Sequence, residues 1–305
     1  MNKTDVQGLL GGPWPEPPAL ETESLETLDR GDYLAERISY QLEPGERTEA
    51  WLLTPKSSSM ASGSRFPGIA IWHQHNDEYH LGKSESAGFA GNPMHHTGPL
   101  LVREGYIVLC PDALGFEGRR HESLDGPSYE RHMAMHYIAA GKSLAWKNIL
   151  DNRRALDSLC SRSDVDASRI GCYGHSLGST FTWLTGPWDN RLKCMVGNCC
   201  MPSQAAMDGT AINHSFSNYI PGLNRIGDIP EYVALTAPRR LHLNFGAEDA
   251  LNPVEYLEKE LPRIAILYKD AGAEDAFSWY IDSDAGHELS ESMKDYMLRV
   301  FRENL

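Results

Sequence analysis

The pentapeptide Gly-His-Ser-Leu-Gly at 174–178 constrains the fold of this chain more than any other segment. It follows a short apolar run at 169–173 and leads into a second apolar stretch at 177–184, a pattern that predicts a strand, a sharp turn and a helix. Glycine at both ends lets the strand and the helix approach closely, because glycine has no Cβ. The turn would expose the Ser176 hydroxyl at a helix N-terminus, where the helix dipole favours negative charge. We therefore predict that Ser176 is a nucleophile.

Short apolar runs alternate with amphipathic stretches along the rest of the chain. The predicted strands cover 67–72, 106–110, 169–173, 192–200, 240–245 and 277–281, and the predicted helices cover 99–104, 143–159, 177–184, 254–265 and 289–301. This alternation predicts an α/β fold, with a mostly parallel central sheet and helices on both faces. Before it, the runs at 38–42 and 50–53 flank Pro44-Gly45 and predict an N-terminal β-hairpin, followed by a polar loop at 57–64.

The length of 305 residues would suit two domains, but the alternating pattern uses nearly all of it. We predict an N-terminal arm over 1–34 and one catalytic domain over 35–305. Within that domain, two long excursions at about 113–140 and 201–230 separate the predicted elements. Long excursions in a compact domain are usually lids or pocket walls.

A serine nucleophile needs a base that a third group orients. In a strand-turn-helix context of this kind, the acid and then the histidine follow the serine in the chain. Three histidines follow Ser176, at His214, His242 and His287. His242 lies inside a predicted strand, so we interpret it as a packed residue. His287 follows the last predicted strand, and we predict that it is the base.

The acid is expected in the loop after the second-last predicted strand. Asp249 lies there, and we predict that it orients His287, with Glu248 as the competing candidate. Asp282 and Asp284 are closer to His287 in sequence. Because they share its loop, they are less able to orient the imidazole from its far side.

A tetrahedral intermediate also needs backbone N–H donors for its oxyanion. We expect one from Leu177, the residue after the nucleophile. The other should come from the loop after the strand at 67–72, from His75 or, as the alternative, from Gln74.

Several further segments resemble one known group of enzymes. They are HQHN at 73–76, GKSE at 82–85, PDALGFE at 111–117, DNRRALD at 151–157 and SDVD at 163–166. With the serine turn, they make roughly residues 35–303 similar to the α/β-hydrolase superfamily, and within it to dienelactone-hydrolase-like and acetyl-xylan-esterase-like serine esterases. The resemblance implies a serine carboxylesterase that works through an acyl-enzyme and needs no cofactor.

The chain departs from this pattern at two places. Many relatives have His-Gly where this chain has His73-Gln74, so the Gln74 side chain is a candidate for substrate contact. Dienelactone hydrolases proper use a cysteine where Ser176 stands, which points to ordinary esters, with short acyl groups or small molecules as substrates. His175, Tyr137 and Met201 are the other candidates for substrate binding, although we assign His175 no part in the chemistry.

Rival functions remain open at this stage. They are hydrolysis of an amide, peptide or carbon–carbon bond, an acyltransferase or lyase reaction, and a non-catalytic binding role. The twelve histidines contain no HExxH pattern, so we predict no metal site.

Composition narrows the partners and the compartment. A net charge of −14 disfavours nucleic acid and anionic membranes, which leaves a small-molecule ester as the expected partner. No apolar run approaches the roughly 18–20 residues that span a bilayer, and the start has no secretory pattern. The six cysteines form no CxxC pair, as in a reducing cytoplasm. We expect a cytoplasmic protein and leave a homo-oligomer open.

Overall fold

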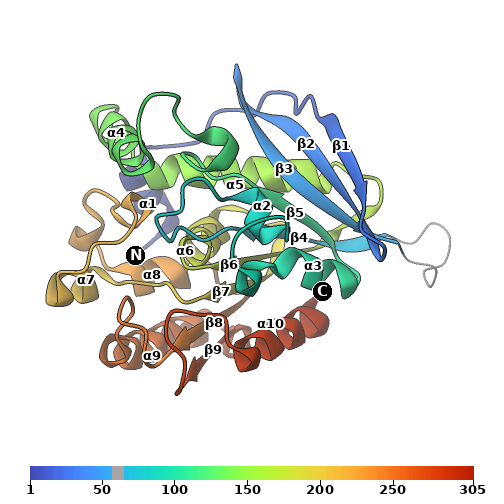
Figure 1. Ribbon diagram of the computed structural model, residues 1–305. Helices are drawn as coiled ribbons and strands as arrows, with labels where there is room; N and C mark the ends of the chain where they lie inside the picture. Colours follow the sequence, from blue (N-terminus) through green and yellow to red (C-terminus); the bar gives the residue numbers. More distant parts are fainter. Residues whose placement is uncertain (57–64) are drawn as a thin grey trace.

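A nine-stranded sheet runs through the computed structural model, which describes residues 1–56 and 65–305 (Figure 1). The predicted polar loop at 57–64 lies outside the described residues. The strands are β1 (Glu23–Asp29), β2 (Tyr33–Glu43), β3 (Glu46–Pro55), β4 (Phe66–Trp72), β5 (Ile107–Pro111), β6 (Val165–His175), β7 (Leu192–Asn198), β8 (Arg240–Gly246) and β9 (Phe277–Asp282). Their order across the sheet is β1-β2-β3-β5-β4-β6-β7-β8-β9.

The six strands β4 to β9 run parallel to one another. Strands β1, β2 and β3 extend the sheet at one side, and each pairs antiparallel with its neighbours. The predicted hairpin is β2 and β3, which turn at Pro44-Gly45. Strand β4 lies between β5 and β6, so the chain moves outward from β4 to β5 and then crosses back to β6. In open α/β sheets, ligands bind beyond the carboxyl ends of the strands at such a reversal.

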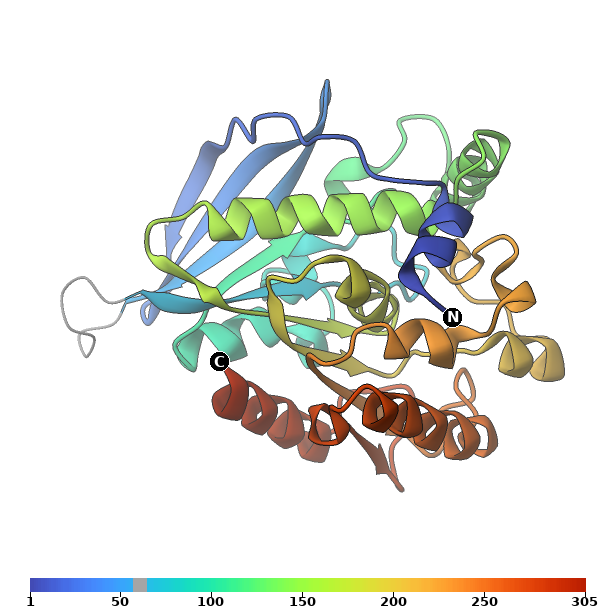
Figure 2. The ribbon, with the colours of Figure 1, turned by 180° about the vertical axis from the view of Figure 1, so that it is seen from behind.

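Helices cover both faces of the sheet (Figure 2). On one face, apolar side chains of α5, α6, α8 and α9, together with those of the N-terminal helix α1, pack into one core. On the other, α3 and α10 pack into a second core. The helices are α1 (Lys3–Leu10), α2 (Lys83–Ser86), α3 (Thr97–Arg103), α4 (Gly126–Ala139), α5 (Leu144–Cys160), α6 (Leu177–Thr185), α7 (Gln204–Thr210), α8 (Ile229–Ala234), α9 (Val254–Asp270) and α10 (Glu291–Asn304). The predicted fold class is confirmed.

The predicted arm at 1–34 is different in the structure, because part of it belongs to the sheet. Strand β1 pairs with β2 along an edge, and α1 buries Val6 and Leu10 in the core. The side chains of β1 are nearly all exposed. Backbone pairing therefore holds this strand, and its sequence carries no apolar alternation that would reveal it. Within residues 1–56 and 65–305, no helix combines the length and apolarity needed to cross a bilayer.

Candidate active site

The turn from β6 into α6 places Ser176 in a conformation that few residues adopt. Its φ is 55° and its ψ is −114°, and the helix begins at the next residue. A Cβ on Gly174 would lie within 3.0 Å of the Gly178 backbone, and a Cβ on Gly178 within 3.0 Å of the Trp72 carbonyl oxygen at the end of β4. Both glycines are therefore required for three backbone segments to meet beneath the serine.

Three side chains that lie far apart in the sequence come together above this turn. The Ser176 hydroxyl donates a hydrogen bond to His287 Nε2 over 2.9 Å, and His287 Nδ1 donates to Asp249 Oδ2 over 2.8 Å. The Asp249 side chain is fully buried, whereas about a quarter of the His287 side chain is exposed. The geometry is that of a nucleophile, a base that can take its proton, and an acid that orients the base.

The loop after β8 prepares Asp249 for this position. The carboxylate also accepts hydrogen bonds from the Leu251 N–H over 2.8 Å and from Asn252 Nδ2 over 3.0 Å. Burial raises the pKa of the Asp249 carboxyl, but the hydrogen bond and charge of His287 and these two donors outweigh it and hold the pKa below its ordinary value. The acid therefore stays ionised while it holds the imidazole.

The competing acids have other roles in the structure. The Glu248 N–H donates to the Ala285 carbonyl over 2.9 Å, which ties the acid loop to the histidine loop. Asp282 accepts from Ser290 Oγ over 2.6 Å, just before α10. The Asp284 N–H in turn donates to Asp282 Oδ1 over 3.2 Å, within a turn of the loop.

Residues at the end of β7 hold the loop that carries His287. Asn198 Nδ2 and Cys199 Sγ donate to the Glu288 carbonyl over 3.0 and 3.2 Å. Donor atoms of Cys199, Asp249 and His287 lie within 4.8 Å of one another, a set that could hold a soft divalent ion. Because Asp249 and His287 already hydrogen-bond to each other, such an ion would compete with the triad.

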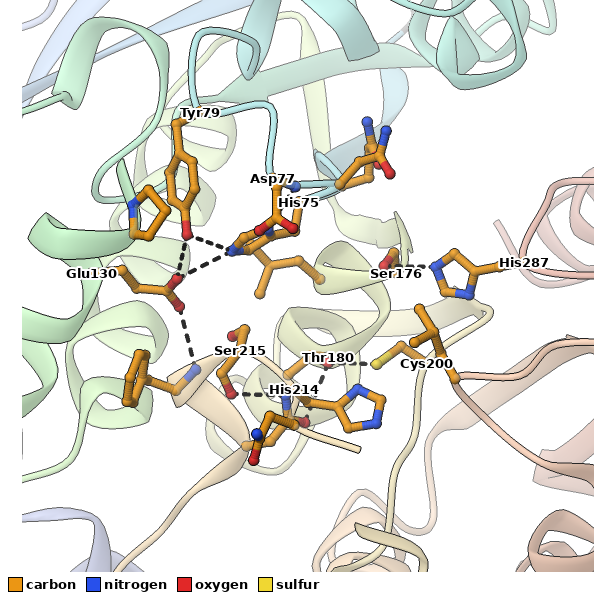
Figure 3. A pocket seen from close by; sticks show the side chains of 18 of the residues that line it. His75, Asp77, Tyr79, Glu130, Ser176, Thr180, Cys200, His214, Ser215 and His287 are labelled. Atoms are coloured by element: carbon orange, nitrogen blue, oxygen red, sulfur yellow. Dashed lines mark hydrogen bonds and ion pairs between the residues drawn. The ribbon is translucent and has the colours of Figure 1, made fainter. Parts of the chain in front are cut away.

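Ser176 and His287 open into a pocket of about 350 Å³ at the carboxyl edge of the sheet (Figure 3). Its walls come from the loop after β4, from α4 and from the second excursion. The remaining lining residues are Gln74, His75, Asn76, Asp77, Tyr79, Pro127, Glu130, Arg131, Leu177, Thr180, Cys200, Asn213, His214, Ser215, Phe216, Asn218 and Leu251. Most of these residues have polar side chains, although their carbon atoms supply about half of the pocket surface.

The expected oxyanion donors border the same pocket. Leu177 is the first residue of α6, so its N–H has no partner within the helix. Gln74 and His75 line the pocket on the β4 side. The approach of Gly178 to Trp72 brings these two segments together. The structure thus places both predicted donor segments beside Ser176.

Of the four residues predicted to bind substrate, Gln74 borders the pocket, but its side-chain amide donates to the buried Glu85 carboxylate over 2.9 Å. The other three are not among the lining residues. His175 is buried between His95 and His287, at ring distances of 4.8 and 5.2 Å, because consecutive strand residues face opposite sides of a sheet. Tyr137 packs against the core on the α5 side of α4, with its ring 6.5 Å from that of Trp146.

Met201 is also buried in the core rather than in the pocket wall. The chain turns inward after β7, and the Met201 N–H donates to Asn252 Oδ1 over 3.1 Å. Because Asn252 also bonds Asp249, this residue supports the acid loop from below.

Sequence reasoning missed Glu130, Tyr79 and His214, which all line the pocket. No local pattern marks Glu130, whose helix has polar residues on every side. His214 was considered only as a candidate base, and it lies on the pocket wall opposite Tyr79 (Figure 3). Glu130 and His214 lie in the two excursions, which were the available signal for them, whereas Tyr79 lies in the loop after β4.

The chain is similar to several known proteins. The model of the Dienelactone hydrolase family matches residues 84–214. YtaP of Bacillus subtilis (strain 168), which is named as a hydrolase, is 29% identical over 282 residues, or 90% of each chain. The glucuronoyl esterase from Solibacter usitatus superposes with a TM-score of 0.69 at 15% identity, covering 98% of this chain and 90% of that one. The acetyl xylan esterase from Paenibacillus sp. R4 gives 0.63 at 18% identity, covering 100% and 96%.

Proposed function

We propose that the chain, which has the α/β-hydrolase fold and is similar to the Dienelactone hydrolase family over residues 84–214, is a serine carboxylesterase whose triad is Ser176, His287 and Asp249. The observation that carries the proposal is the continuous hydrogen-bonded line from serine through histidine to aspartate. The hydrolase and esterase names of the relatives support the same class of reaction.

In the proposed reaction, Ser176 Oγ attacks the ester carbonyl carbon while His287 Nε2 takes the hydroxyl proton. The N–H groups of Leu177 and of His75 or Gln74 hold the oxyanion. His287 then gives its proton to the leaving alcohol, which breaks the carbon–oxygen bond and leaves an acyl-serine. Water that His287 deprotonates then attacks this acyl group, and His287 returns the proton to Ser176 Oγ as the bond to the serine breaks and the acid leaves. Asp249 stabilises the imidazolium in both halves, and the cycle needs no cofactor.

The pocket supports a small, polar ester as the substrate. Its apolar lining is short, at Pro127, Leu177, Phe216 and Leu251, which suits a short acyl group better than a fatty chain. The polar groups on the other walls would solvate a polar alcohol. All six cysteines are free thiols in the structure, which supports our proposal of a cytoplasmic protein.

Hydrolysis of p-nitrophenyl esters from acetate to dodecanoate tests the proposal. We expect turnover of the short esters to decline steeply with chain length. The Ser176→Ala protein should lose it entirely, whereas Ser123→Ala, on an exposed loop, should match the wild type. Hydrolysis that persists in Ser176→Ala would refute the mechanism. If the wild type leaves these esters intact but cleaves amides or transfers acyl groups, the esterase assignment is wrong and that other reaction takes its place.

A further inference from the structure

Glu130 reaches into the pocket from a helix that is otherwise mostly exposed. Of the residues of α4, Ala134 is the one that is fully buried. The Glu130 side chain is nonetheless mostly buried, with only 11% of its surface exposed. Asp77, the other carboxylate that lines the pocket, is 87% exposed. A carboxylate withdrawn from water needs hydrogen-bond donors, so its partners indicate its role.

Three donors from two distant segments converge on this carboxylate (Figure 3). His75 Nε2 lies 3.1 Å and Tyr79 OH 2.8 Å from Glu130 Oε2, and both residues follow β4. The Phe216 N–H, in the second excursion, donates to Oε1 over 3.3 Å. A single side chain of the first excursion thus joins the loop after β4 to the second excursion.

The loop after β4 needs such support because its backbone is strained. Asn76 and Asp77 have φ values of 45° and 55°, in the left-handed region that non-glycine residues seldom occupy. His75 Nδ1 accepts the Asp77 N–H over 3.0 Å, so the ring proton is on Nε2 and points to Glu130. The imidazole therefore links the strained turn on one side to the carboxylate on the other.

The approach of α4 to this loop is close and specific. A Cβ on Gly126, the first residue of the helix, would lie within 3.0 Å of the Tyr79 ring. Burial raises the pKa of the Glu130 carboxyl, but the hydrogen bonds from His75, Tyr79 and the Phe216 N–H outweigh it and lower the pKa overall. Glu130 is thus held as a carboxylate, the form that accepts from all three donors.

We propose that Glu130 is a positioning residue that holds the 74–79 loop so that its backbone N–H faces the oxyanion formed at Ser176. The inference rests on the proposed function, since it concerns the second oxyanion donor of that same site. In this role, Glu130 does not touch the reacting atoms. It acts through His75 and Tyr79, and its loss would misplace the donor by loosening the strained turn.

Steady-state kinetics of four variants on p-nitrophenyl acetate tests the proposal. Glu130→Ala should lower kcat by about 10- to 100-fold with KM within about 3-fold, because an oxyanion donor acts in the transition state. Glu130→Gln keeps an acceptor oxygen and should retain more activity than Glu130→Ala. Tyr79→Phe removes the hydroxyl that contacts both Glu130 and His75 but leaves the bond between His75 and Glu130, so it should cause a smaller fall. Glu122→Gln, an exposed carboxylate of the same excursion, is the control.

The rate at which a fluorophosphonate labels Ser176 is a second readout, since this reaction uses the oxyanion site without any ester substrate. It should fall in the same order among the variants. Wild-type kinetics in Glu130→Ala, or a raised KM at unchanged kcat, would overturn the positioning role. If the wild type hydrolyses no ester while labelling still slows in Glu130→Ala, the proposed function fails and the positioning role stands. Should Glu130→Ala fail to fold, Glu130→Gln and Tyr79→Phe decide.

Discussion

Replacement of Gly178 by alanine should separate the two halves of the oxyanion site. The added Cβ would point at the Trp72 carbonyl oxygen, and the gap would have to open by about 1 Å to reach 3.0 Å, the lower limit for real Cβ contacts. Trp72 precedes the loop of Gln74 and His75, and Gly178 follows Leu177. The added methyl group would therefore push apart the segments that carry the two N–H donors. Because the three nearest atoms, from Trp72 and His73, are all backbone, no side-chain rotation can relieve the contact.

A misplacement of this size in a catalytic site costs about 10²-fold in rate, and overpacking of a buried backbone costs about 3 kcal/mol. We expect kcat on p-nitrophenyl acetate to fall by about 10²-fold with KM nearly unchanged. At about 2 °C per kcal/mol for a chain of this length, the melting temperature should fall by about 6 °C. Gly8→Ala is the matched control, because a Cβ there meets no atom within 4 Å. Wild-type kcat/KM in Gly178→Ala would refute the reasoning from close backbone approach.

Three further predictions follow from the same structure. Asp249→Asn should lower kcat by about 10³- to 10⁴-fold at nearly unchanged KM, because an amide cannot hold His287 in the required tautomer, and steady-state assays check it. Burial raises the pKa of Glu260 to about 7, so the folded state binds this proton more tightly and the stability that Glu260 contributes falls as pH rises from about 4.5 to 7. Glu260→Gln should therefore be about 2–3 kcal/mol more stable than the wild type at pH 8 and equal to it below pH 4.5 in urea unfolding; equal stability at both pH values would contradict the assignment. Gly126→Ala should push the Tyr79 ring and lower kcat/KM about 10-fold in the ester assay, and an unchanged value would show that α4 can shift freely.

The triad positions could be predicted because each follows an apolar strand whose own residues mark it. Ser176 comes directly after β6, Asp249 three residues after β8 and His287 five residues after β9. The carboxyl ends of parallel strands meet at one edge of the sheet, so residues that follow different strands could be expected to lie close together there. Whether these three residues perform the proposed catalysis stays a prediction until the kinetics are measured.

Residues whose positions depend on tertiary packing could not be predicted in this way. Glu130 reaches the pocket only because α4 packs against Tyr79, a contact that no periodicity encodes. His175 and Met201 were predicted to bind substrate, yet strand alternation and the inward turn after β7 bury both. Strand β1 was missed because its exposed side chains follow no apolar pattern.

The triad and the pocket wall come from different parts of the chain, which has a practical consequence for directed evolution. The triad is built on strand ends, whereas much of the pocket wall comes from α4 and from 213–218. Libraries at Pro127, Arg131 and Asn213 would diversify substrate range with little risk to folding. Glu130 should be kept constant in such libraries, since its carboxylate joins α4 and the 213–218 segment to the loop that follows β4.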